Sequence, residues 1–368
     1  MVGVDRVKTT MEKQQFIVYT NKTIQPIVQS EIDAFKEHGV DVIVSAFNPT
    51  CAISARVLNI PSIVLLSATV SSAYFKSGYA TFPENFENTF TRLLPESFKK
   101  YLAKWVLLNN KKFLVKDFNA VVKKYNTKKF KTLNEILEGD YTLLCDDINF
   151  LNIKPTKKVP IENFVGPVSM GLSEEKIEDL DIDVKKHLER PGKSILVILG
   201  SASSKITSPI GKLFIEILKI FNKTDYNVIA VHAKISREDL PNVEENILLK
   251  QYLNRPQIVN NMVDLAIIHG GRGTVYNSAY SGKPSIGIPS FIEQQYNIDC
   301  LVRNKVCIRI SSKHFKPEEL LKAINTIFEN YDYYLKNAKA LSEKLSKEVD
   351  EEKAVNRLVQ IIEKEIKQ

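Results

Sequence analysis

The stretch from residue 264 to 310 constrains this chain most, because a strand-like apolar run meets a glycine-rich turn inside it. The apolar run, residues 265–268, ends at His269-Gly270-Gly271-Arg272-Gly273-Thr274, and a helix-compatible segment follows. Glycines allow close backbone approach, and the amides of a helix N-terminus favour a phosphate. Thr274 is predicted either to cap that helix or to bond a phosphate oxygen through its hydroxyl, and His269 to add a donor. The spacing is not that of a P-loop, which indicates a diphosphate site of another kind.

Apolar runs bounded by turns alternate with helical periods along most of the chain, which is typical of an α/β fold with parallel sheets. The predicted strands are residues 41–46, 62–67, 141–145, 163–165, 194–199, 227–231, 246–249, 265–268, 285–288 and 307–310. The predicted helices of the second half are residues 209–221, 274–281, 294–304, 317–328 and about 331–367. Residues 84–138 form a helical region without a strand signal, and the acidic stretch 167–192 indicates a linker with a short helix. The pattern therefore predicts two domains.

Three linked motifs in the second half resemble the donor-binding signature of family 1 glycosyltransferases, especially the macrolide-glycosyltransferase-like branch. They are His269-Gly270-Gly271-x-Gly273-Thr274, Gly282-x-Pro284 and Pro289-x-x-x-Glu293-Gln294-x-x-Asn297. The resemblance implies the GT-B fold, with two Rossmann-like domains facing a cleft. It places an N-terminal acceptor-side domain at residues 1–166 and a donor-binding domain at 193–348. It also implies that a C-terminal helix, residues 349–368, crosses back to the first domain.

The resemblance implies roles for individual residues of the donor-binding domain. The diphosphate would contact His269, Gly270, Gly271, Gly273, Thr274 and Ser201. Glu293 and Gln294 would bind hydroxyl groups of the donor sugar, since a carboxylate and an amide together suit a vicinal diol. Gln257 and Asn277 would contact the nucleoside.

Two positions depart from the family pattern. Asn277 stands where the family usually has a ribose-binding Glu, and Asn254 where a base-stacking Trp is common. UDP is the expected nucleotide from the resemblance, and TDP and GDP stay open.

The beginning of the chain differs from the family. Residues 1–40 contain a helix-prone lead-in, and the first clear strand signal lies at residues 42–45. The family's first strand and loop, which usually carry a catalytic His, have no counterpart. We therefore expect an incomplete N-terminal domain, and a catalytic base in a loop that this sequence lacks.

Bulk properties narrow the class of protein. The 368 residues carry a net charge of +8, a moderate bias that does not predict a nucleic-acid partner. The four cysteines are scattered without metal-ligand spacing, and residues 1–15 do not resemble a signal peptide. We expect a cytoplasmic, membrane-peripheral protein with neither a bound metal nor a cofactor.

Residues 98–131 interleave aromatic and aliphatic side chains with many lysines and almost no acidic residues. Such a basic amphipathic segment predicts contact with an anionic membrane surface. The same position forms the acceptor pocket in the family, where Trp105, Phe113 and Phe118 would contact the acceptor. An ordinary domain helix with buried apolar residues and solvated lysines is the simplest interpretation of the pattern, and contact with a nucleic acid is a third.

We predict a metal-independent, inverting glycosyltransferase that moves a sugar from a nucleotide-diphosphate donor to a hydroxyl group of a small-molecule or lipid acceptor. Two alternatives stay open. The chain could be a non-catalytic nucleotide-sugar-binding protein or helper subunit, or a sugar-nucleotide epimerase of the same fold.

Overall fold

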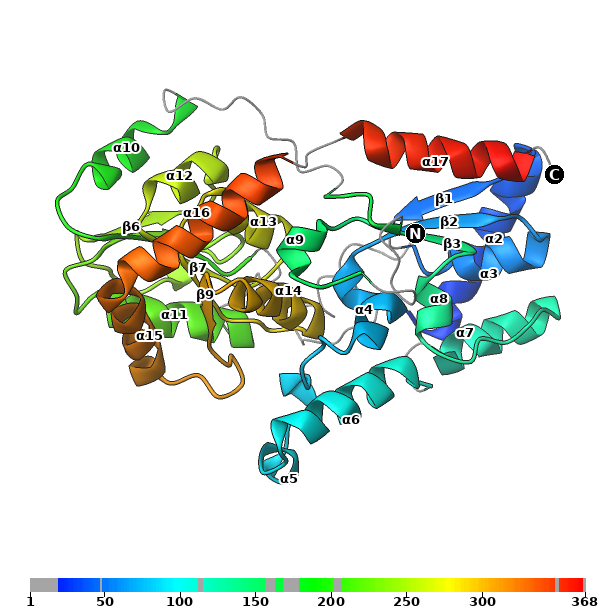
Figure 1. The fold of residues 1–368 in the computed structure, drawn as a ribbon, viewed down its shortest axis with the longest axis horizontal. Helices are drawn as coiled ribbons and strands as arrows, with labels where there is room; N and C mark the ends of the chain where they lie inside the picture. Colours follow the sequence, from blue (N-terminus) through cyan, green and yellow to red (C-terminus); the bar gives the residue numbers. More distant parts are fainter. Residues whose placement is uncertain are drawn as a thin grey trace.

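The computed structural model describes residues 19–46, 48–111, 115–155, 163–167, 179–200, 207–347 and 351–366. Two parallel sheets lie at opposite ends of the molecule, each packed against helices (Figure 1). The α/β fold class predicted from the sequence is confirmed. Among the described residues no helix is long and apolar enough to cross a membrane.

The first sheet is small and entirely parallel. Its strands are β1 (Ile43–Ala46), β2 (Ser62–Leu66) and β3 (Tyr141–Leu144), in the order β1-β2-β3. The predicted strand at residues 163–165 forms only a single bridge, between Leu144 and Phe164. The helices of this half are α2 (Asn21–Glu37), α3 (Cys51–Leu58), α4 (Ser72–Ser77), α5 (Thr89–Arg92), α6 (Glu96–Leu108), α7 (Val115–Val122), α8 (Asn134–Leu137) and α9 (Ile148–Leu151).

The second sheet has the order β6-β5-β4-β7-β8-β9, and all its pairs are parallel. Its strands are β4 (Ser194–Ile198), β5 (Asn227–Val231), β6 (Ile247–Lys250), β7 (Leu265–Ile268), β8 (Ser285–Gly287) and β9 (Cys307–Arg309). From β4 the next strands, β5 and β6, are added on one side, and from β7 the next strands, β8 and β9, are added on the other. The carboxyl ends of β4 and β7 therefore meet at a switch point, which is where open α/β sheets bind ligands.

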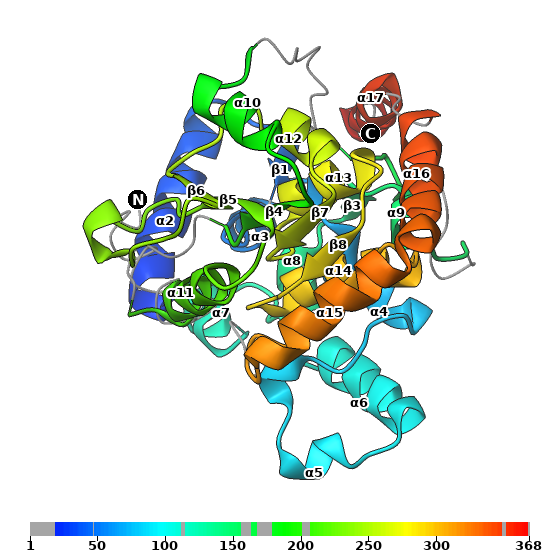
Figure 2. The same cartoon turned by 90° about the vertical axis from the view of Figure 1, so that its left-hand side faces the viewer.

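Helices cover both faces of the second sheet (Figure 2). They are α10 (Ile182–Leu188), α11 (Pro209–Phe221), α12 (Pro256–Met262), α13 (Arg272–Tyr280), α14 (Ile292–Arg303), α15 (Pro317–Glu329) and α16 (Tyr331–Lys347). The start of α11 follows directly from its sequence. Pro209 occupies its first turn, where no amide donor is needed, and the Ser208 side chain accepts from the Gly211 amide 3.0 Å away.

Apolar contacts join the two halves. One buried cluster contains Leu144 and Phe150 from the first half together with Ile268 and Tyr276 from the second. The last helix, α17 (Glu351–Ile366), lies against the first sheet (Figure 1), where Ile361 is buried in the cluster that contains Ile63. The final helical stretch thus divides into α16, on the second half, and α17, on the first.

Candidate functional site

The glycine-rich turn connects β7 to α13 at the switch point of the second sheet. Gly270 has φ of +91°, and the Gly200 residue that follows β4 has φ of +82°, both in the region that favours glycine. The His269 ring lies close to Gly200 and Gly271. An added Cβ would lie 2.6 Å from its Nε2 at Gly200 and 2.4 Å from it at Gly271. Close packing around one imidazole therefore requires glycine on both sides.

His269 is neutral in this packing. Its Nδ1 lies 3.3 Å from the carbonyl oxygen of Ile198, and because a carbonyl only accepts, the ring proton sits on Nδ1. Burial lowers the pKa of His269 to about 4, and the bond to Ile198 only partly offsets that effect. The ring therefore adds no positive charge to the turn near neutral pH, and any neutralisation of an anion depends on the backbone.

The N-terminus of α13 supplies that backbone. The helix begins at Arg272 with Gly271 as its N-cap residue, and no side chain caps it. The Val275 amide donates to the Gly271 carbonyl, 3.0 Å away. Among the described residues, no acceptor is recorded for the amides of Arg272, Gly273 and Thr274. Three uncapped amides at the positive end of a helix form a site for an anion.

The prediction that Thr274 caps the helix is wrong. The helix starts two residues earlier, with Gly271 as an extended N-cap residue and no side-chain cap. Thr274 is therefore the third helical residue. A Cβ added at Gly273 would find no atom of a described residue within 4 Å, so none of these residues closes the turn on that side.

Arg272, the intervening residue of the first motif, joins the two halves of the molecule. Its Nε lies 3.5 Å from Oδ1 of Asp146, and its guanidinium lies over the Tyr276 ring, 5.3 Å from the centroid. Burial opposes the charge of Arg272, but the carboxylate of Asp146 outweighs it, and the pKa of Arg272 is raised.

Asp146 is buried at the end of β3 and accepts several hydrogen bonds. Its donors are the Ala68 amide at 2.6 Å, the Ser67 hydroxyl at 3.1 Å and the Tyr276 hydroxyl at 2.9 Å. In the sequence, Asp146 is only one of two adjacent acidic residues after a predicted strand. No local signal could link it to α13, which lies about 130 residues away in the chain.

The two predicted sugar-binding residues occupy different environments. Glu293, in the first turn of α14, is partly exposed, and burial raises its pKa against the lowering effects of Asn297 and Arg272. Gln294 is buried, and its Oε1 accepts from the Ser290 amide at 2.9 Å. Of the two, Glu293 is the side chain that remains accessible to a ligand.

Asn297, the last residue of the third motif, ties the turn to the first half. Its Nδ2 donates to the Gly270 carbonyl at 3.0 Å, and its Oδ1 accepts from the Thr69 hydroxyl at 2.7 Å. The motif does not predict the bond between Asn297 and Thr69, because the two residues lie 228 positions apart in the chain.

The structure brings together the two predicted nucleoside-binding residues. Nε2 of Gln257 lies 3.3 Å from the carbonyl oxygen of Asn277, and both residues are partly exposed. Ser201 lies outside the described residues, although Gly200 beside it is described. Within the described ranges, no group of three or more His, Cys, Asp or Glu side chains could hold a metal ion.

The segment predicted to contact a membrane or acceptor divides into two parts. Trp105 on α6 is 57% exposed, whereas Phe118 on α7 is fully buried against α2. Phe113 lies outside the described residues. The prediction that Phe118 contacts an acceptor is therefore wrong, because α7 turns its apolar face toward the core of the first half.

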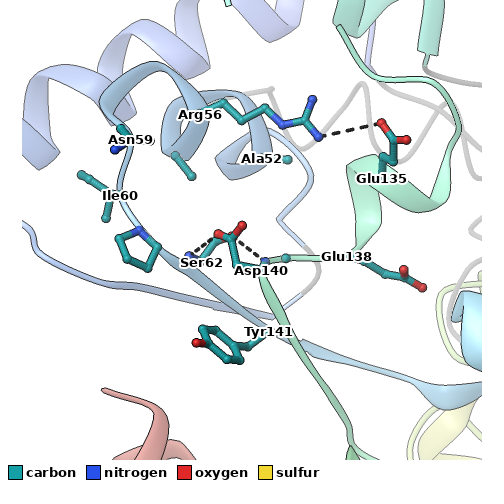
Figure 3. A pocket seen from close by; sticks show the side chains of 12 residues that line it. Ala52, Arg56, Asn59, Ile60, Ser62, Glu135, Glu138, Asp140 and Tyr141 are labelled. Atoms are coloured by element: carbon teal, nitrogen blue, oxygen red, sulfur yellow. Dashed lines mark hydrogen bonds and ion pairs between the residues drawn. The ribbon is translucent and has the colours of Figure 1, made fainter. Parts of the chain in front are cut away.

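A large cavity lies elsewhere, at the amino ends of β2 and β3. It has a volume of about 670 Å³, and its lining includes Arg56, Ser62, Glu135 and Asp140 (Figure 3). Asp140 accepts from the amide and hydroxyl of Ser62, and Arg56 faces Glu135 at 3.9 Å. The polar groups of this cavity largely bind one another, and it lies at the strand ends opposite to the glycine turn.

Comparisons with known proteins show what the chain is similar to. Residues 194–355 match the glycosyltransferase family 28 C-terminal domain. The chain is 22% identical over 293 residues to the putative UDP-glucuronosyltransferase ugt-46 of Caenorhabditis elegans, covering 78% of this chain and 52% of that protein. It is 23% identical over 315 residues to human UDP-glucuronosyltransferase 3A2, covering 82% and 58%. The chain thus spans about half the length of the curated relatives it matches.

Solved glycosyltransferases share the fold. The structure of the kitacinnamycin glycosyltransferase matches with a TM-score of 0.62 and 16% identity, over 93% of this chain and 80% of that one. Glycosyltransferase VinC, solved in complex with dTDP, matches with a TM-score of 0.59 and 11% identity, over 99% and 82%. The GT-B fold and the family resemblance predicted from the sequence are confirmed.

Proposed function

We propose, from the premise that this chain belongs to the glycosyltransferases of the GT-B fold, that it binds a UDP-sugar and transfers the sugar to a hydroxyl group of an acceptor. The observation that carries the proposal is the open N-terminus of α13, where three amides have no recorded acceptor among the described residues. A nucleoside diphosphate leaving group needs this kind of fixed, dipolar environment.

The amides of Arg272, Gly273 and Thr274 would hold the diphosphate oxygens and stabilise the charge that develops as the sugar leaves. The neutral His269 ring, fixed by the Ile198 carbonyl, supports the turn rather than adding charge. Glu293 would accept a hydrogen bond from a sugar hydroxyl. The helix dipole supplies the neutralisation that a metal gives in other transferases, so the proposed reaction needs no metal. Transfer would proceed by direct displacement with inversion.

A second candidate function is binding of the nucleotide sugar without transfer. The two carboxylates at the end of β3 are both engaged: Asp146 accepts from the Ala68 amide, and Asp147 accepts from the Asn149 amide at 2.6 Å. Neither is placed as a general base for an acceptor hydroxyl, which must lose a proton as it attacks. This arrangement favours a chain that binds the donor and depends on another group for the base.

Isothermal titration of the purified chain with UDP, TDP and GDP tests the donor site. We expect one nucleotide to bind, and binding to be lost in His269→Ala, since removing the ring leaves the turn unsupported. His38→Ala, at an exposed position on the end of α2, is the matched control and should bind like the parent chain. Absence of binding by every nucleotide, in a chain shown to be folded by circular dichroism, would refute the donor site.

Gly273→Ala sharpens the test. An added Cβ meets no atom of the described residues within 4 Å, and Ala is preferred over Gly in a helix by about 1 kcal/mol, so the fold should keep or gain stability. If the open space holds the diphosphate, the same methyl group weakens nucleotide binding. Release of UDP from a UDP-sugar, with and without simple alcohols or phenols, then separates transfer from binding alone.

A further inference from the structure

Large apolar side chains gather on the outer surface of α5 and α6. We name this the α5–α6 aromatic surface, and its residues with their exposed fractions are Phe90 (72%), Leu93 (83%), Phe98 (48%), Tyr101 (66%) and Trp105 (57%). The two helices project from the body of the molecule in both views (Figures 1 and 2). A group of this kind, unlike single exposed residues, indicates a binding surface.

The exposed aromatic residues of α6 do not belong to the face of the helix that packs against the rest of the protein. Ala103 and Leu107 already bury the inner face in the cluster that contains Tyr74 and Phe75. Phe98, Tyr101 and Trp105 follow at spacings of three and four residues, so they form a second apolar stripe on the outside of the same helix. Nothing in the described structure covers that stripe.

Positive charge surrounds the stripe. Residues 87–112 contain six basic residues and two acidic residues, Glu87 and Glu96, and Glu87 lies 3.9 Å from Arg92 and 4.0 Å from Lys99. Lys100 is exposed beside the stripe, whereas Lys99 pairs with Glu96 at 3.1 Å. Lysine is depleted at the centres of protein–protein interfaces, but it is common beside aromatic residues that enter a bilayer interface. The combination favours lipid over a protein partner.

We propose that the α5–α6 aromatic surface docks the protein onto an anionic lipid bilayer. Phe90, Leu93 and the three aromatic residues of α6 enter the interfacial region, and the lysines remain among the anionic headgroups. Because α6 is held to the body by α4, this contact fixes how the molecule lies on the membrane. The inference does not depend on sugar transfer, since vesicle binding requires neither donor nor acceptor.

The composition of the chain gives a direct probe. Trp105 is the only tryptophan, so the intrinsic tryptophan fluorescence of the full chain reports on this surface alone. Vesicles of phosphatidylcholine with and without about a third phosphatidylserine are titrated into the protein. We expect a blue shift of emission, and quenching by brominated lipid, with the anionic vesicles and little change with the neutral ones.

Variants that leave Trp105 in place separate the two contributions. Phe98→Ala should lower the vesicle partition coefficient about tenfold through lost apolar burial. Lys100→Ala should lower it about fivefold through lost attraction to the anionic surface. Tyr333→Ala removes an aromatic residue of similar exposure (52%) on the other half of the molecule, and it is the matched control that should bind as the parent chain does.

Three outcomes overturn the proposal. The first is Trp105 emission that stays unshifted and accessible to iodide with every vesicle. The second is vesicle binding that Phe98→Ala and Lys100→Ala leave unchanged. The third is a blue shift that grows with protein concentration in the absence of lipid, because a second copy would then cover the surface. A nucleotide titration of the same variants, expected to match the parent chain, distinguishes failure of this surface from failure of the donor site.

Discussion

The contact between Tyr276 and the end of β3 offers a quantitative test of how the two halves are joined. Tyr276 is fully buried on α13, and its ring stacks on Phe150 with centroids 4.3 Å apart. Its hydroxyl donates to Oδ1 of Asp146 at 2.9 Å and accepts from the Asp147 amide at 3.0 Å. Tyr276→Phe removes both bonds while the ring, and therefore the packing, stays in place.

The magnitude follows from the two lost bonds. A hydrogen bond to a buried carboxylate contributes about 1.5–3 kcal/mol, and one between neutral groups about 0.5–1.5 kcal/mol. We therefore expect the free energy of unfolding to fall by roughly 2–4 kcal/mol. The same residue ties α13 to Asp146, so the helix that follows the glycine turn loses one of its supports. We therefore expect nucleotide affinity to fall as well.

Urea unfolding followed by circular dichroism measures the first effect, and isothermal titration the second. Tyr333→Phe, at a half-exposed position on α16, is the control and should change the free energy of unfolding by less than about 0.5 kcal/mol. A Tyr276→Phe variant as stable as the parent chain would refute the reasoning, because it would mean that the two halves do not make this contact in solution.

Three further changes test other parts of the structure. Burial lowers the pKa of His269 to about 4, so the contribution of this neutral ring to stability is fully present above the usual pKa of about 6.5 and is lost as the pH drops toward 4. The urea midpoint of His269→Gln should therefore fall less than that of the parent chain between these pH values. An equal fall in both proteins would contradict the neutral assignment of His269. Ile361→Ala should lower the free energy of unfolding by about 2–4 kcal/mol, because Ile361 fixes α17 to the first sheet, whereas Val355→Ala at an exposed position should have little effect. Gly287→Ala places a Cβ 2.4 Å from Cγ2 of Ile298 and should lower the free energy of unfolding by about 1–3 kcal/mol. Adding Ile298→Ala in the same chain should relieve part of this clash. If the effects of the two substitutions in urea unfolding simply add, the close contact is contradicted.

The second sheet could be predicted in detail from the sequence. Each of its strands is an apolar run bounded by turn residues, and the observed strands lie within one or two residues of the predicted ranges. The glycine turn was also visible, because His269 to Thr274 form one continuous segment between a strand and a helix. Residues this close in the chain meet in space whatever the rest of the fold does.

The start of α13 and the organisation of residues 84–138 were harder to predict. Thr274 has the chemistry of a cap, but Gly271 takes that position, where the His269 ring leaves no room for a Cβ. The long helical region divides into short helices, and α7 buries the phenylalanine that its sequence could equally have exposed. An amphipathic pattern shows that a helix has two faces, but it does not show which face meets the core.

The sequence by itself determined the local elements: the strands, the glycine turn and the motifs that indicate a nucleotide-sugar donor. Only the tertiary structure decided which distant groups complete them. Gly200 packs against His269 because β4 and β7 are neighbours, and Asp146 meets Arg272 because the carboxyl ends of the two sheets face each other. The physical reason is that local patterns depend on backbone and side-chain preferences within a few residues. Contacts between β3 and α13, or between Thr69 and Asn297, depend on how complete layers pack.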